Sequence, residues 1–211
     1  MSSVEAVGFA SGDGTVLEGE IDTADDPFAS AVLCHPHPQF GGSMRAGIIG
    51  DLFRALQAQG LTTLRFNFRG VERSQGAWDE GRGEQADAVA AVDTLATAVP
   101  ATLPLLLVGW SFGADMALSV HHDRVAGWCA IAPPLHFATG LDVTGADPRP
   151  KHLILGERDD VVSAERVGEL TTGWATTTRE TIPGATHFFV GRSAEVVAAV
   201  FGFCRDAARS S

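Results

Sequence analysis

A serine that could act as a nucleophile lies at the centre of a Gly-x-Ser-x-Gly segment spanning residues 109–113. A run of apolar residues long enough for one buried strand precedes the segment, and a helix-compatible stretch, 114–120, follows it. This strand–turn–helix context is what a nucleophile elbow requires, because the strained turn lifts the serine hydroxyl above the sheet. A Cβ at Gly109 or Gly113 would collide with a neighbouring strand or helix. Ser111 is therefore the candidate nucleophile of an acyl-transfer reaction.

A serine hydroxyl also needs an imidazole to take its proton and a carboxylate to orient that imidazole. In enzymes built around such an elbow, the chain order is serine, acid, histidine. Asp159 follows an apolar run and Gly156, and is the expected acid; Asp160 is the alternative, because spacing alone allows an offset of one residue. His187 follows the next apolar run and is the only histidine C-terminal to Asp159. We expect Ser111, Asp159 and His187 to act together.

The oxyanion that forms during acyl transfer needs N–H donors. One expected donor is the backbone amide of Phe112, the residue after the nucleophile. The other should come from the segment 34–44, which contains the run His-Pro-His-Pro. Because proline has no N–H, His37 is the expected second donor, and Gln39 or Phe40 is the alternative.

The two histidines of this segment, His35 and His37, raise the alternative of a metal site. On an extended chain their side chains would point the same way, but no acidic or histidine partner at ligand spacing lies nearby. We therefore expect His35 to pack under the loop, and we expect neither a metal nor a cofactor.

The elements that must position these residues alternate between strands and helices along the chain. Apolar runs and turn residues predict strands over 4–10, 15–21, 29–34, 61–66, 103–108, 125–132, 151–155 and 175–182. Helical spacing predicts helices over 46–59, 83–98, 114–120, 164–170 and 193–208. Such alternation favours an α/β fold with a mostly parallel, doubly wound sheet and helices on both faces. The candidate residues would then meet at the carboxyl ends of the strands.

Composition narrows the class of protein. A length of 211 residues with 45% hydrophobic residues favours one domain, 1–211, with a substantial core. The formal net charge of −11 argues against nucleic acid or an anionic membrane as partner. Three scattered cysteines indicate a reducing compartment. Residues 1–6 show no targeting signal and no apolar run reaches the roughly 18 residues of a membrane span, so we expect a cytoplasmic protein.

Five motifs in order carry a resemblance to a known family. They are the run His-Pro-His-Pro-x-x-Gly-Gly-Ser-Met at 35–44, followed by 67–71, 109–113, 156–162 and 186–189. From about residue 30 to its end, the chain resembles the small, lid-less bacterial α/β-hydrolases of the dienelactone-hydrolase-like group. The resemblance implies Ser111, Asp159 and His187 as a catalytic triad, and carboxylesterase-type activity on small or extended acyl esters. Dienelactone hydrolases proper use cysteine where this chain has Ser111, which argues against their specific reaction.

A cap domain is not expected, because only residues 133–150 separate two strands where caps are usually inserted in this fold. The open site that results should be bordered by Phe40, Trp110, Pro133, Leu135 and His136. The same machinery could serve a thioesterase or a small-peptide hydrolase. A non-catalytic binding module is the remaining alternative, and the presence of all three triad residues argues against it.

Overall fold

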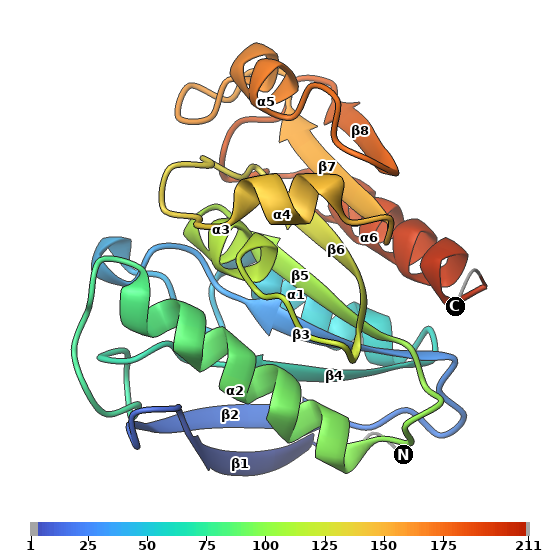
Figure 1. The fold of residues 1–211 in the computed structure, drawn as a ribbon. Helices are drawn as coiled ribbons and strands as arrows, with labels where there is room; N and C mark the ends of the chain where they lie inside the picture. The colour runs from blue at the N-terminus through green and yellow to red at the C-terminus, as the bar shows by residue number, and fades with distance from the viewer. Residues whose placement is uncertain (1–3, 210–211) are drawn as a thin grey trace.

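The computed structural model describes residues 4–209 (Figure 1). Residues 1–3, part of the segment considered above for a targeting signal, and residues 210–211 lie outside the described residues. The strands are β1 (Val4–Ala10), β2 (Val16–Asp22), β3 (Ala29–Cys34), β4 (Leu61–Phe66), β5 (Leu105–Trp110), β6 (Val125–Ile131), β7 (Lys151–Gly156) and β8 (Thr177–Ile182). The helices are α1 (Gly47–Gln57), α2 (Arg82–Ala98), α3 (Phe112–Leu118), α4 (Leu141–Ala146), α5 (Ala164–Leu170) and α6 (Ser193–Ala208), with a short 3₁₀ helix η1 (Pro38–Phe40).

The strands form an eight-stranded sheet in the order β1-β2-β4-β3-β5-β6-β7-β8. The pairs β1–β2 and β2–β4 are antiparallel, and all other pairs are parallel. Every residue of β3 and of β5 is buried. Strands that are covered on both faces have continuous apolar sequences, because neither face meets water. The expected α/β fold with a mostly parallel, doubly wound sheet is confirmed.

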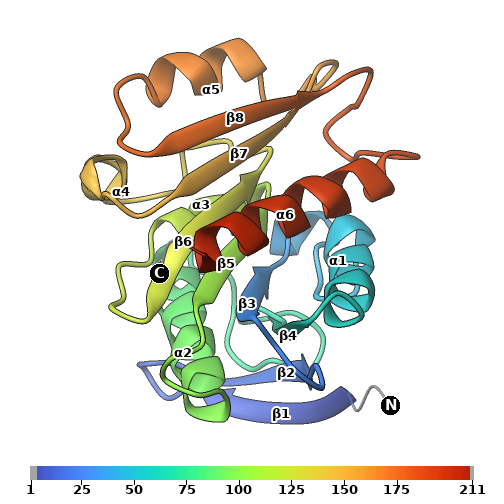
Figure 2. The same cartoon turned by 90° about the vertical axis from the view of Figure 1, so that its right-hand side faces the viewer.

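Helices cover both faces of the sheet. In Figures 1 and 2, α1 and α6 lie on one face, and α2 and α3 lie on the other. Helix α1 packs against β4 and α6, while α3 packs against β5 and β6. One side of α1 is buried and consists of Ile48, Ile49, Leu52, Phe53 and Leu56. This apolar stripe explains why the segment folds as a helix against the sheet.

Most element bounds lie within two residues of those expected, and three differences bear on the site. Strand β5 continues to Trp110, because Gly109 pairs with Cys34 of β3 and Trp110 pairs with Ile131 of β6. Two short helices were not predicted: η1 in the loop after β3, and α4 in the connection between β6 and β7. That connection therefore holds a six-residue helix and no cap domain. Within residues 4–209, no helix has both the length and the apolar character to cross a membrane.

Candidate active site

Ser111 occupies a strained turn between β5 and α3, with φ of 55° and ψ of −123°. Its N–H donates to the carbonyl of Ile131 at 2.8 Å, which fixes the turn on the neighbouring strand β6. A Cβ at Gly109 would lie 2.1 Å from the carbonyl oxygen of Gly113, and a Cβ at Gly113 would lie 2.3 Å from that of Cys34. Glycine is therefore required on both sides of the serine. A non-glycine residue in this conformation is held by its surroundings and is common at functional sites.

The side chains of Ser111, His187 and Asp159 form one hydrogen-bonded series. His187 Nε2 lies 2.9 Å from Ser111 Oγ, and His187 Nδ1 lies 2.9 Å from Asp159 Oδ2. The other carboxylate oxygen of Asp159 accepts the N–H groups of Val161 at 2.9 Å and Val162 at 2.7 Å. The loops after β5, β7 and β8 thus bring together three residues that are far apart in the sequence. The carboxylate that contacts His187 belongs to Asp159 and not to Asp160.

Trp110 supports the loop that carries His187. Its indole N–H donates to the carbonyl of His187 at 3.2 Å, and its side chain is buried. The ring also packs against the start of α1, where a Cβ at Gly47 would lie 2.9 Å from it. From the sequence we expected Trp110 to border the substrate site. In the structure its indole instead makes an internal contact that holds the backbone of His187 in place.

The loop after β3 closes on itself around the carbonyl of His37. That carbonyl accepts the N–H groups of Phe40 and Gly42, each at 3.1 Å. The N–H of Gln39 is bound by the His37 ring at Nδ1, at 3.2 Å. The turn thus uses the amides of both alternative oxyanion donors, Gln39 and Phe40. Within residues 4–209, the backbone N–H groups of His37 and Phe112 have no hydrogen-bond partner.

Aromatic rings gather around the His37 imidazole, at 4.5 Å from Trp78, 4.7 Å from Phe40, 5.2 Å from Phe112 and 5.4 Å from Phe137 between centroids. Burial, together with the nearby His136, lowers the pKa of His37. The ring is therefore neutral at pH 7, and its Nδ1 is the acceptor that closes the turn. We call these rings the His37 cluster.

His35 lies below this loop and is fully buried. Its Nε2 accepts the N–H of Phe68 at 3.1 Å, and its Nδ1 donates to the carbonyl of Pro36 at 2.6 Å. Burial lowers the pKa of His35 to about 4, so the ring is neutral. With both nitrogens bonded to the protein, His35 packs under the loop as expected. Among the described residues, no three His, Cys, Asp or Glu side chains are grouped as metal ligands.

The remaining expected site residues lie in the connection that follows β6. Pro133 and Leu135 are buried, whereas His136 is exposed. This connection is bound by Asp115 of α3, a residue to which the sequence motifs gave no role. A signal for it was present, because Asp115 is the one charged residue in a helix whose other residues are all buried and non-charged.

Large apolar side chains are exposed in the loops that carry the candidate residues. They are Phe40 beside His37, Val161 after Asp159, and Phe188 and Val190 after His187. Phe40 is 85% exposed, and the Phe188 ring lies 5.5 Å from the His187 ring between centroids. Exposed apolar rings therefore lie next to both His37 and His187.

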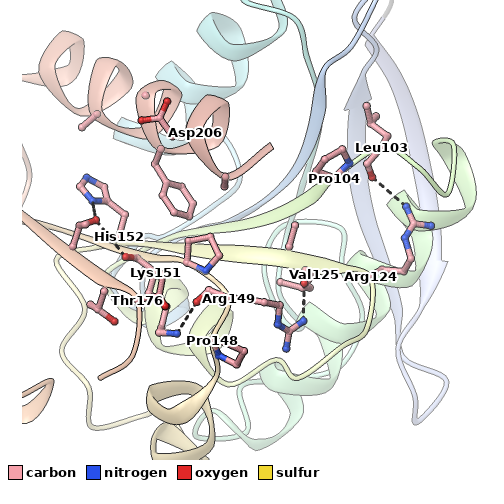
Figure 3. A pocket seen from close by; sticks show the side chains of 18 of the residues that line it. Leu103, Pro104, Arg124, Val125, Pro148, Arg149, Lys151, His152, Thr176 and Asp206 are labelled. Carbon is pink, nitrogen blue, oxygen red and sulfur yellow. Dashed lines mark hydrogen bonds between the residues drawn. The ribbon is translucent and has the colours of Figure 1, made fainter. Parts of the chain in front are cut away.

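A hollow of about 1660 Å³ lies at the other end of the sheet, where β5 to β8 begin (Figure 3). It is lined by none of the candidate site residues. Its cationic side chains Arg124, Arg149 and Lys151 donate to backbone carbonyls of the surrounding chain. His152 lies here too, at the amino end of β7, and bonds the hydroxyl of Thr178. These groups hold the strand starts together.

Comparison with known proteins agrees with this architecture. Residues 30–199 match the family model described as alpha/beta hydrolase domain. An uncharacterised protein of Rickettsia prowazekii is 34% identical over 195 residues, which are 87% of this chain and 82% of that protein. The chain belongs to the α/β-hydrolase family.

Solved structures place the chain near proteins of the same kind. An α/β serine hydrolase homologue from Coxiella burnetii is 31% identical with a TM-score of 0.84, covering 93% of this chain and 95% of that one. A Xanthomonas campestris member of the α/β serine hydrolases without lid is 28% identical with a TM-score of 0.84, covering 97% and 94%. The chain is thus a hydrolase of the lid-less α/β type.

Proposed function

We propose that this hydrolase is a carboxylesterase that cleaves uncharged acyl esters through a Ser111–His187–Asp159 triad. The observation that carries the proposal is the unbroken series from Asp159 Oδ2 through both nitrogens of His187 to Ser111 Oγ, with each step at 2.9 Å. Two backbone N–H groups without partners, on His37 and Phe112, flank this series and fit an oxyanion hole.

In this mechanism Ser111 Oγ attacks the acyl carbon while His187 Nε2 takes the hydroxyl proton. Asp159 holds the imidazole by its Nδ1–H and stabilises the imidazolium that forms. The amides of His37 and Phe112 bind the oxyanion of the tetrahedral intermediate. His187 then returns the proton to the leaving alkoxide, and water releases the acyl group from Ser111 by the reverse sequence of proton transfers.

The surroundings of the triad favour an apolar, uncharged substrate. Phe40, Val161, Phe188 and Val190 are exposed in the loops that carry the candidate residues, and burying apolar substrate surface against them is favourable. The net charge of −11 repels anionic molecules. The short connection between β6 and β7 leaves the site open, which accommodates an extended acyl or alcohol group.

Labelling with a fluorophosphonate probe, combined with hydrolysis of p-nitrophenyl esters, tests this proposal. We expect the wild-type protein to be labelled at Ser111, and Ser111→Ala to lose labelling and about 10⁶ in kcat, because the nucleophile is removed. Ser30→Ala is the matched control, since Ser30 lies near the start of β3, at the opposite end of the strands from the triad, where its hydroxyl bonds the carbonyl of Pro104. A folded wild-type protein that is neither labelled nor able to hydrolyse esters or thioesters would contradict the proposal.

A further inference from the structure

Asp115 lies on α3 four residues after Ser111, one helical turn from the proposed nucleophile. Its side chain is completely buried. No lysine or arginine of the described residues forms an ion pair with it. A buried carboxylate without a basic partner is rare, because removing the charge from water is costly. Asp115 therefore needs an explanation beyond packing.

The contacts of Asp115 are with three consecutive backbone amides of the connection between β6 and α4. Oδ1 accepts the N–H of Leu135 at 2.9 Å, and Oδ2 accepts those of His136 at 3.1 Å and Phe137 at 3.0 Å. Hydrogen bonds to an ionised acceptor are roughly twice as strong as neutral ones. A single carboxylate thus fixes the course of the chain directly after β6.

This connection is not held by its own conformation. Ala132 and Leu135 have φ values of 46° and 59°, which side chains other than glycine adopt only under restraint. The connection places the ring of Phe137 at 5.2 Å from Phe112 and 5.4 Å from His37 between centroids. It therefore packs against the side chains of the two residues whose amides are proposed for the oxyanion hole.

We propose that Asp115 is a positioning residue that holds residues 133–137 as the acyl-binding wall of the site, and so sets the preference for longer acyl groups over acetyl. The inference rests on the proposed esterase function. An acetyl group is too small to reach far along such a wall. A longer acyl chain gains its binding energy from the wall and loses it when the wall moves.

The electrostatics around Asp115 are consistent with this role. Burial raises the pKa of Asp115 to about 6, although the three N–H groups and His136 favour its charged form. Helix α2 packs on α3 and carries two more buried carboxylates, Glu84 and Asp87. Those two are bound elsewhere, Glu84 by the amides of residues 79 and 81 and Asp87 by the Arg69 guanidinium. His136 and His37 are the other titratable groups near residues 133–137.

The sharpest experiment compares Asp115→Asn with Asp87→Asn, since each change removes one buried charge of similar shape. The measured quantity is the ratio of kcat/KM for p-nitrophenyl hexanoate to that for the acetate. We expect Asp115→Asn to lower this ratio about tenfold, mainly through KM for the hexanoate. Asp87→Asn should lower the melting temperature, because it breaks the pair with Arg69, and should leave the ratio unchanged.

The wild-type protein gives a second measurement that needs no variant. Any loss of triad activity on acidification slows both esters equally, so it cancels in the ratio. We expect the ratio to fall as the pH drops from 7 to 5, because a neutral Asp115 holds the wall more weakly. A ratio that is equal in Asp115→Asn and wild type at pH 7 would overturn the inference while leaving the esterase intact.

Amide hydrogen exchange separates the two proposals, because it does not depend on activity. We expect the amides of residues 135–137 to exchange faster in Asp115→Asn than in Asp87→Asn, each relative to wild type. Equal protection in the two variants would contradict the role of Asp115. Failure of the wild type to react with a fluorophosphonate would instead contradict the proposed esterase.

Discussion

At the scale of single residues, the hydrogen bonds around His187 specify one tautomer. Because a carboxylate accepts hydrogen bonds, the contact with Asp159 places a proton on Nδ1 of His187, and Nε2 is free to accept from Ser111. The second oxygen of Asp159 is bound by two backbone amides, those of Val161 and Val162. The carboxylate is therefore fixed in orientation before any substrate binds.

This arrangement predicts different effects of two neighbouring substitutions. Asp159→Asn should lower kcat for p-nitrophenyl acetate by about 10⁴, because an amide favours the wrong imidazole tautomer. Asp160→Asn should change kcat less than about threefold, since its side chain does not contact His187. Steady-state kinetics of both variants decide the matter, and a larger loss in Asp160→Asn would reverse the assignment of the acid.

The choice between these two residues shows what sequence can supply at this scale. The order of serine, acid and histidine located the region of Asp159, but spacing alone left Asp160 open. The decision depends on the turn after β7, which directs one carboxylate toward His187. The contact of Trp110 with the His187 carbonyl could not be anticipated for the same reason. The direction of a side chain at a strand end follows from the turn and not from the pattern.

At the scale of elements, the loop after β3 is built against the nucleophile turn. A Cβ at Gly42 would lie 2.0 Å from the carbonyl oxygen of Pro36, so the loop folds back on itself tightly. A Cβ at Gly113 would meet the carbonyl oxygens of both Cys34 and His35. The two backbones therefore touch, and any displacement of η1 shifts the amide of His37 relative to Ser111.

A pair of substitutions at one position tests the proposed donor. His37 has φ of −51°, which proline can adopt. His37→Pro removes the backbone N–H and the ring, whereas His37→Ala removes only the ring. We expect kcat for His37→Pro to fall by about 10² to 10³ below that of His37→Ala, because an oxyanion donor is lost. Equal kcat values in the two folded variants would exclude the His37 amide as donor.

The positions of the central strands and of α1 followed from the sequence because their burial leaves a clear apolar pattern. Strands β3 and β5 are continuous apolar runs, and α1 has one apolar stripe. Helix α4 has only six residues, Leu-Asp-Val-Thr-Gly-Ala, and its N-cap, Gly140, offers no side-chain cap. Such a segment shows neither periodicity nor a start signal. Its helix forms through tertiary contacts, among them the bond from the Thr144 hydroxyl to the Leu118 carbonyl at 2.6 Å.

At the scale of the whole molecule, buried charges connect segments that are distant in the sequence. The Arg69 guanidinium bonds Asp87 on α2 and also Asp13 and Ser11 in the turn between β1 and β2. The antiparallel edge of the sheet is thereby tied to the helical layer. Asp115 has the opposite character, since it bonds only backbone amides and its ionised form is disfavoured by burial. Ionisation of the carboxylates paired with Arg69 should therefore stabilise the fold, whereas ionisation of Asp115 should destabilise it.

The pKa values of three aspartates give the sign of the dependence of stability on pH. Asp13 and Asp147 have pKa values lowered to about 2, by the Thr15 amide and by the Arg149 guanidinium respectively. Their contribution to stability is present above about pH 4 and is lost as the pH falls toward 2. The pKa of Asp115 is raised from 3.8 to about 6, so the folded protein binds its proton more readily than the unfolded chain. Its ionisation therefore destabilises the fold above about pH 6, and this penalty disappears as the pH falls from 6 to 4.

Thermal unfolding of wild type and Asp115→Asn between pH 4 and 8 measures this penalty directly, because all other titrations cancel in the difference. Each tenfold change in proton affinity on folding corresponds to about 1.4 kcal/mol, so the carboxylate lowers the free energy of unfolding by up to about 3 kcal/mol at pH 7. We expect the melting temperature of wild type, relative to Asp115→Asn, to rise by several degrees as the pH falls from 7 to 4. A difference that stays constant over this range would mean that Asp115 titrates as an ordinary carboxylate. A rise would show that the fold tolerates a destabilising charge one turn from Ser111, which is expected of a residue kept for the site and not for stability.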